Sequence, residues 1–145
     1  MTLKSALTAV GLVLGLFLFL FLFLFLFLGS ARAATMECPA KSTQMDDIIE
    51  SLNAAKGCDA AMMVFQACEY GASGDVQFGE VVEKKCEADF FDKANASKKQ
   101  AYKRELRVCD RKYRNESGSM YRSFTAFCRA EVAQRYSRQL RKAAR

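Results

Sequence analysis

Residues 102–132 read YKRELRVCDRKYRNESGSMYRSFTAFCRAEV and contain two apolar helical patterns on either side of a polar loop. In the first pattern, apolar side chains recur at intervals of four, three and four residues, which is the spacing of one helix face. This face consists of Tyr102, Leu106, Cys109 and Tyr113. The inner face expected for the second helix consists of Met120, Phe124, Phe127, Cys128 and Val132. The stretch therefore predicts two antiparallel helices joined by a short loop.

The positions of the cysteines fit helices that are held together in pairs. One cysteine of each predicted helix lies at a similar distance from the loop, and symmetric positions of an antiparallel hairpin face each other. By the same symmetry, two further cysteines flank residues 71–74, a turn with two glycines, and the last two then pair with each other. The predicted disulfides are Cys109–Cys128, Cys58–Cys86 and Cys38–Cys68.

An alternative connectivity stays open, because six cysteines allow 15 sets of pairs. It joins Cys38 to Cys58 and Cys68 to Cys86. In this set the short arm before the first helix has to run back along about 20 Å of that helix, at 1.5 Å per residue. The predicted set avoids that path and is favoured.

Two further helices are expected in the first part of the domain, where apolar side chains are again spaced three and four residues apart. The first begins at Thr43, which can form a capping pair with Asp46, and it ends at Gly57. The second begins near Asp59 and ends at Gly71.

A third helix begins near Asp75 and frays around Asn95, and Ser97 is expected to cap the first helix of the hairpin. No part of this region alternates strictly between apolar and polar residues, as a half-buried strand would. The predicted fold is therefore all-α, a small disulfide-stapled bundle of about five helices that follows an N-terminal signal peptide.

The N-terminal segment is a separate region, rich in leucine and phenylalanine and without charge over residues 6–28. The small residues Ala31 and Ala33 precede a possible cleavage site, as in secretory signal peptides. We therefore expect a signal peptide at residues 1–33 and one helical, cysteine-rich domain with a basic tail at residues 34–145. The alternative is an uncleaved membrane anchor, because the apolar segment exceeds the roughly 20 residues needed to cross a bilayer.

The chain has six cysteines and no histidine. An even set of cysteines behind an export signal predicts a disulfide framework, and hence a periplasmic or secreted protein. It would be membrane-anchored only if the leader is retained. Without histidine, Ser-His and Cys-His catalysis are excluded, and the cysteine spacings do not suit zinc. We therefore expect no enzyme, no cofactor and no metal; catalysis by carboxylates alone is the remaining alternative.

Charge is divided unevenly along the chain. Residues 34–97 contain 5 lysines and arginines against 12 acidic residues, whereas residues 98–145 contain 15 against 4. Two interpretations stay open. The acidic half can fold against the basic half so that their charges partly cancel, or the basic half can face outward and bind an anionic partner.

Between Gln100 and Leu140 a helix with a glutamine and an aromatic residue leads to a cysteine, a Gly-Ser loop and a second cysteine. The residues concerned are Gln100, Tyr102, Arg104, Cys109, Gly118, Ser119, Met120, Cys128, Arg135 and Leu140. This arrangement resembles the C-terminal half of small exported domains of the LprI-type lysozyme-inhibitor family. The resemblance implies a helical, cysteine-bearing fold that inhibits lysozyme. The chain departs from the family in having no tryptophan and in the spacing of its N-terminal cysteines.

The expected function is that of an exported, non-enzymatic binding protein, with a cell-wall glycosidase or an anionic component of the envelope as partner. Lysozyme-type glycosidases act through two carboxylates, which basic side chains around the hairpin loop could contact. The alternatives are a basic face that binds an anionic envelope surface or polymer, and a structural envelope protein. We expect no specific nucleic acid, and membrane contact only through an uncleaved leader. The candidate binding residues are Arg111, Lys112, Arg114, Arg122, Arg138 and Arg141.

Overall fold

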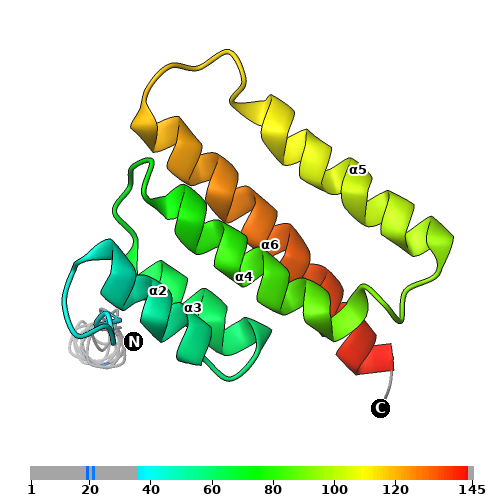
Figure 1. Cartoon of the computed structure of the whole chain (residues 1–145), viewed down its shortest axis with the longest axis horizontal. Coiled ribbons are helices and arrows are strands. Elements are labelled where there is room, and N and C mark those ends of the chain that lie inside the picture. The colour runs from blue at the N-terminus through cyan, green and yellow to red at the C-terminus, as the bar shows by residue number, and fades with distance from the viewer. Residues whose placement is uncertain (1–18, 20, 22–35, 144–145) are drawn as a thin grey trace, which may run out of the picture. The chain divides into compact units, whose positions relative to one another are not determined.

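The computed structural model describes residues 36–143 together with Phe19 and Phe21. Apart from Phe19 and Phe21, the predicted signal peptide lies outside the described residues, and so does its cleavage after Ala33. Residues 36–143 form five α-helices and no strand (Figure 1), which confirms the all-α prediction. Within the part of the chain that the structure describes, no helix combines the length and the apolar character needed to cross a bilayer.

Three long helices and two short ones make up this domain. They are α2 (Met45–Ala54), α3 (Cys58–Cys68), α4 (Asp75–Phe90), α5 (Ala96–Lys112) and α6 (Ser119–Ala143). Helices α4 and α6 lie side by side and run in the same direction, and α5 returns antiparallel along the far side of α6 (Figure 1). The pair α2 and α3 packs against α4 on the side away from α5. Helix α6 is therefore central, whereas α5 is at an edge.

The core is built mainly from large side chains of α2 to α5 and one edge of α6. Phe65 and Phe127 stack with their ring centroids 4.0 Å apart, which joins α3 to α6. Phe90, Tyr102 and Tyr136 form a second cluster, with centroids 5.1 to 5.6 Å apart, which joins α4, α5 and α6. Because each fully buried large apolar side chain contributes about 1.5–3 kcal/mol, these clusters stabilise the domain.

Helices α4 and α6 pack closely along a seam of small residues. A Cβ atom added to Gly79 would lie 2.9 Å from the Cβ of Ala126, so only glycine fits there without a shift of one helix. The small buried residues of α6 are Ser123, Ala126, Ala130, Ala133 and Ser137. The predicted inner face of α6 is therefore partly wrong: Met120 and Phe124 are 47% and 40% exposed. Large side chains along the seam would hold the two helices apart.

Each end of this seam carries a hydrogen bond between a serine and an aspartate. Ser123 donates to Asp75 at 2.6 Å, and Ser137 donates to Asp89 at 2.5 Å. Asp75 is fully buried and also accepts the backbone N–H of Tyr70 at 2.8 Å. These bonds satisfy polar groups whose burial would otherwise be costly.

The start of α2 differs from the sequence prediction. The helix follows Gln44, and the hydroxyl of Ser42 accepts the Gln44 N–H at 3.1 Å and donates to Asp47. The expected capping pair of Thr43 with Asp46 is therefore wrong, because α2 begins at Met45, two residues later than expected, and Ser42 contacts the first helical turn instead.

Two other helix ends also differ. Gly57 has a φ of +86°, a conformation that favours glycine, but it lies directly before α3, whereas α2 already ends at Ala54. At α5 the side chain of Asn95 accepts the N–H of Lys98 at 2.9 Å, so Asn95 caps the helix and Ser97 is inside it.

All six cysteines are in disulfides, which are Cys38–Cys68, Cys58–Cys86 and Cys109–Cys128. They are the same three pairs that the spacing of the cysteines predicts. The first ties the N-terminal arm to the end of α3, the second ties α3 to α4, and the third ties α5 to α6. Three disulfides indicate an oxidising compartment outside the cytosol.

Candidate functional site

Arg129 of α6 is held by carboxylates of the two neighbouring helices. Its Nε and Nη2 donate to the two carboxylate oxygens of Glu83 at 2.9 and 2.8 Å, and its Nη1 donates to Asp110 at 2.7 Å. Burial raises the pKa of Glu83 above its usual value, although Arg129 opposes this. Burial would lower the pKa of Arg129, but its hydrogen bonds to the two carboxylates outweigh that effect and raise it. The network links α4, α5 and α6 through one side chain.

Three more arginines of α6 also form ion pairs. Arg135 pairs with Glu105 of α5, and Arg138 and Arg141 both pair with Asp59 of α3. Burial favours a raised pKa for Asp59, but the two arginines outweigh it and lower the pKa. These arginines are 44–55% exposed, so each pair contributes at most about 1 kcal/mol. Together with Arg129, four arginines of α6 are thus paired with carboxylates of the fold.

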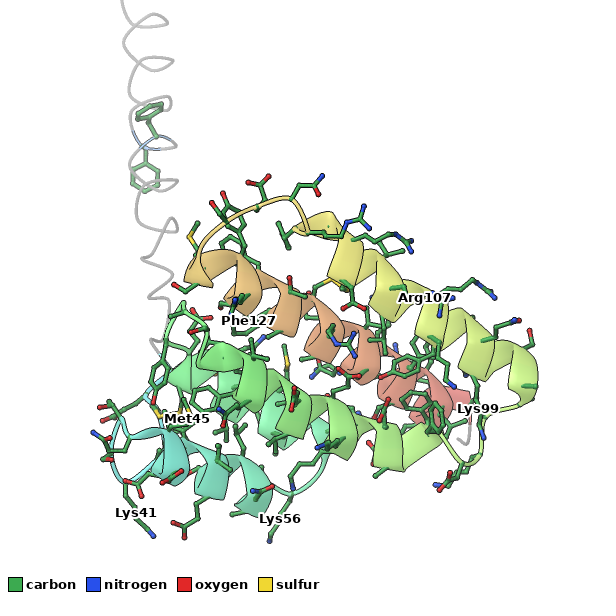
Figure 2. All side chains as sticks on the ribbon, turned by 45° about the horizontal axis from the view of Figure 1, so that its top comes forward. Lys41, Met45, Lys56, Lys99, Arg107 and Phe127 are labelled. Carbon is green, nitrogen blue, oxygen red and sulfur yellow. A yellow bond between two sulfur atoms is a disulfide. The ribbon has the colours of Figure 1, made fainter. Side chains whose placement is uncertain are left out.

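Helix α5 carries a row of arginines that is not neutralised in this way. Their spacing of three, four and three residues places the first three on one side of the helix, over about 10 Å at 1.5 Å per residue, and the fourth just beyond its C-terminal end. This α5 arginine row consists of Arg104, Arg107 and Arg111 of the helix and of Arg114, which lies in the turn two residues after its last residue. All four are exposed, and none forms an ion pair with a described carboxylate. In Figure 2 the side chain of Arg107 extends from α5 away from α6.

Lysines of α5 partly cover aromatic rings beside this row. The Nζ of Lys112 lies 5.1 Å from the ring centroid of Tyr113, and that of Lys99 lies 5.0 Å from the centroid of Phe91. A cation over an aromatic face is attracted to it by about 0.5–1 kcal/mol at exposed sites, which favours these positions of the two charges.

The six predicted binding residues fall into two groups in the structure. Arg138 and Arg141 are engaged by Asp59, whereas Arg111, Lys112, Arg114 and Arg122 have no ion pair among the described residues. Arg104 and Arg107 are missing from the prediction, which takes from α5 only the residues near the hairpin loop. Their helical spacing with Arg111 and Arg114 is the sequence signal that would have found them.

A cavity of about 530 Å³ opens between α4, α6 and the end of α5. We call it the α4–α6 cavity. Gly79 and Ala126 line it where the two helices approach most closely, and Tyr113 and Tyr121 line it near the α5–α6 loop. The charged residues of its wall are Glu80, Glu83, Asp110, Arg114, Glu116, Arg122 and Arg129. The predicted residues Arg114 and Arg122 therefore come together at this cavity.

Comparisons with protein-family models, curated proteins and solved structures find no match to this chain. The similarity to the LprI-type family stays a prediction from the sequence. Among the described residues, no group of three or more acidic or cysteine side chains is placed to hold a metal ion. The α5 arginine row and the α4–α6 cavity are the features on which a function can be argued.

Proposed function

We propose that this protein is an exported, non-enzymatic binding protein that attaches to an anionic surface or polymer of the cell envelope through the α5 arginine row. The observation that carries the proposal is the absence of ion pairs with described carboxylates at four exposed arginines, three on one side of α5 and one just past its end. In the same domain, arginines of α6 are paired with carboxylates of three other helices.

The difference in pairing matters for binding. An arginine that already holds a carboxylate must break that contact before it binds another anion, whereas Arg107 and its neighbours in the row give up only water. Each basic side chain close to an anionic lipid surface contributes about 1 kcal/mol. Arginine also forms bidentate hydrogen bonds with phosphate and carboxylate groups. The row is therefore suited to a partner that presents repeated phosphates or carboxylates.

The row is also held in place before any partner arrives. Cys109 forms its disulfide with Cys128, and the fully buried Tyr102 donates a hydrogen bond to Glu87 at 2.9 Å. Both contacts lie on the side of α5 opposite the row. Because α5 does not have to fold on binding, less conformational entropy is lost in the complex.

The test compares two variants with the same change in charge. The first replaces Arg104, Arg107 and Arg111 of the row by glutamine, and the second does the same at Arg135, Arg138 and Arg141 of α6. Binding of the oxidised protein is measured to vesicles with and without anionic lipid, and to polyglutamate, over a series of salt concentrations. We expect the first variant to lose about a hundredfold in affinity and the second to lose little. Equal losses would overturn the assignment to α5.

Inhibition of a lysozyme-type glycosidase stays a prediction from the sequence resemblance. It is measured with the same preparation, as a stoichiometric loss of lysozyme activity that persists at moderate salt. If the protein inhibits lysozyme and binds no polyanion, the inhibitor function replaces the one proposed. If neither activity is found, the structural role in the envelope is the alternative that remains.

A further inference from the structure

The α4–α6 cavity has a defined order of residues along its length, which follows from the parallel register of the two helices. Glu83 and Arg129 lie one helical turn beyond Gly79 and Ala126, and together with Asp110 they line that part of the cavity. Arg122 lies one turn before Ala126, toward the α5–α6 loop. The paired network is therefore at one end of the cavity, and an arginine without an ion pair is toward the other.

The charges of the wall are only partly compensated. Arg129 uses three donors on Glu83 and Asp110, so these three groups satisfy one another. Four other charged residues of the wall have no ion pair among the described residues. They are Glu80, Arg114, Glu116 and Arg122. Two cations and two anions are left to interact with a bound molecule.

The size and the remaining lining fit a small ligand. Sites for small molecules have volumes of about 300–1,000 Å³, and this cavity has about 530 Å³. Tyr113 and Tyr121, whose ring centroids are 5.9 Å apart, both line it. The small residues Gly79 and Ala126 leave an apolar floor. The cavity therefore offers a place for an apolar or aromatic group in addition to its charges.

We propose that the α4–α6 cavity binds a small zwitterion, a molecule with an ammonium and a carboxylate group of the size of a dipeptide. Its carboxylate is held by Arg122 with Arg114, and its ammonium is held by Glu80 of α4. A ligand of one sign only would leave the wall charges of the other sign unpaired in the complex. A zwitterion satisfies both signs without displacing the contacts of Arg129. This site is distinct from the outward side of α5, although Arg114 belongs to both.

The test uses the dipeptide Ala-Phe in four forms: free, N-acetylated, C-amidated and blocked at both ends. Binding of each form to the oxidised protein is measured by calorimetry. We expect the free dipeptide to bind, and we expect the loss of either charge to weaken binding about tenfold. Glu80→Gln should remove the difference between the free and acetylated forms. Arg122→Gln should remove the difference between the free and amidated forms.

Arg107→Gln is the matched control, because it removes an arginine outside the cavity, and it should leave all four affinities unchanged. Circular dichroism checks that each variant is folded. The proposal is overturned if the free dipeptide does not bind at millimolar concentration, if all four forms bind equally, or if the acetylated form binds best. None of these outcomes bears on polyanion binding, because the variant that tests α5 leaves Glu80, Arg114 and Arg122 intact.

Discussion

Helices α5 and α6 are both rich in arginine, but the fold uses their charges differently. Four arginines of α6 pair with carboxylates of α3, α4 and α5, whereas the four arginines of the α5 row pair with none of the described carboxylates. Of the two interpretations of the uneven charge distribution, pairing within the fold describes α6, and an outward basic face describes α5. Carboxylates of the acidic half, together with Glu105 and Asp110 of α5, pair with arginines of α6, and the arginine side of α5 is left exposed.

The cause of the difference is position in the bundle. Helix α6 lies between α4 and α5, so arginines on its flanks reach carboxylates on both neighbours (Figure 1). Helix α5 is at the edge and has a helical neighbour on one side only. Both helices lie in the basic part of the sequence, so net charge does not show which of them has paired arginines. The number of neighbouring helices decides this.

The largest expected effect comes from releasing α5 from α6. Replacing both Cys109 and Cys128 by alanine removes a disulfide that closes a separation of 19 residues. We expect the free energy of unfolding in urea to fall by about 3 kcal/mol, because the unfolded chain gains freedom. Hydrogen exchange should accelerate more in α5 than in α6. Equal acceleration in both helices would show that α5 is not held mainly by this disulfide.

The next largest effect is expected at Arg129, which donates three hydrogen bonds to the carboxylates of Glu83 and Asp110. Arg129→Leu leaves Glu83, which is 12% exposed, without its cation, and we expect a loss of about 2 kcal/mol in the free energy of unfolding at neutral pH. The matched change in the row, Arg107→Leu, should cost less than about 0.5 kcal/mol. Similar losses in the two variants would contradict the distinction between paired and unpaired arginines.

The pH dependence of the Arg129→Leu variant gives an independent check. The pKa of Glu83 is already raised in the folded protein, and loss of Arg129 should raise it further. A carboxyl group with a raised pKa binds its proton more tightly in the folded state than in the unfolded state. It therefore destabilises the folded protein increasingly as the pH rises from the unfolded pKa through the raised folded pKa. The difference in stability between the variant and the wild type should therefore shrink as the pH falls toward 4, as measured by urea unfolding. A constant difference would show that Glu83 is not the source of the loss.

A smaller effect is expected from the seam that brings the carboxylates of α4 within reach of α6. Gly79→Ala places a Cβ 2.9 Å from that of Ala126. Overpacking costs about 1–3 kcal/mol, and the higher helix propensity of alanine offsets up to about 1 kcal/mol of this cost. We expect a net loss of about 1 kcal/mol in thermal or urea unfolding. Gln77→Ala, on the exposed side of α4, is the control and should not destabilise the protein.

The smallest effect is expected at the exposed pairs of Asp59. Its pKa is lowered in the folded protein, so its stabilising contribution is present above the unfolded pKa of about 4 and is lost as the pH falls through the lowered value. Because the carboxylate is 41% exposed, solvent screening limits this contribution to about 0.5 kcal/mol. Asp59→Asn should be slightly less stable than the wild type at pH 7 and equally stable at pH 2, as measured by urea unfolding.

The sequence predicts the helical fold and the cysteine pairs because both depend on local spacing and on the symmetry of hairpins. It does not predict the inner face of α6. Large apolar side chains such as Phe124 were expected inside, but close packing against Gly79 requires small residues at the seam, so Ala126 is buried and Phe124 is half exposed. The spacing of the arginines in α5 is visible in the sequence. Their lack of partners is not, because it depends on which helices become neighbours.

The two serine–aspartate hydrogen bonds at the ends of the seam have a consequence for how uniquely the bundle is aligned. A seam lined only by small apolar residues would let α6 slide along α4 by one turn at little cost. Both bonds join residues 48 positions apart, so any such slip would separate Ser123 from Asp75 and Ser137 from Asp89 together. The fully buried Asp75 without its hydroxyl partner, and to a lesser degree the partly buried Asp89, make the slipped alignments unfavourable. These two hydrogen bonds thus act against misalignment, and they hold α4 and α6 in the register that brings Gly79 and Ala126 together at the cavity.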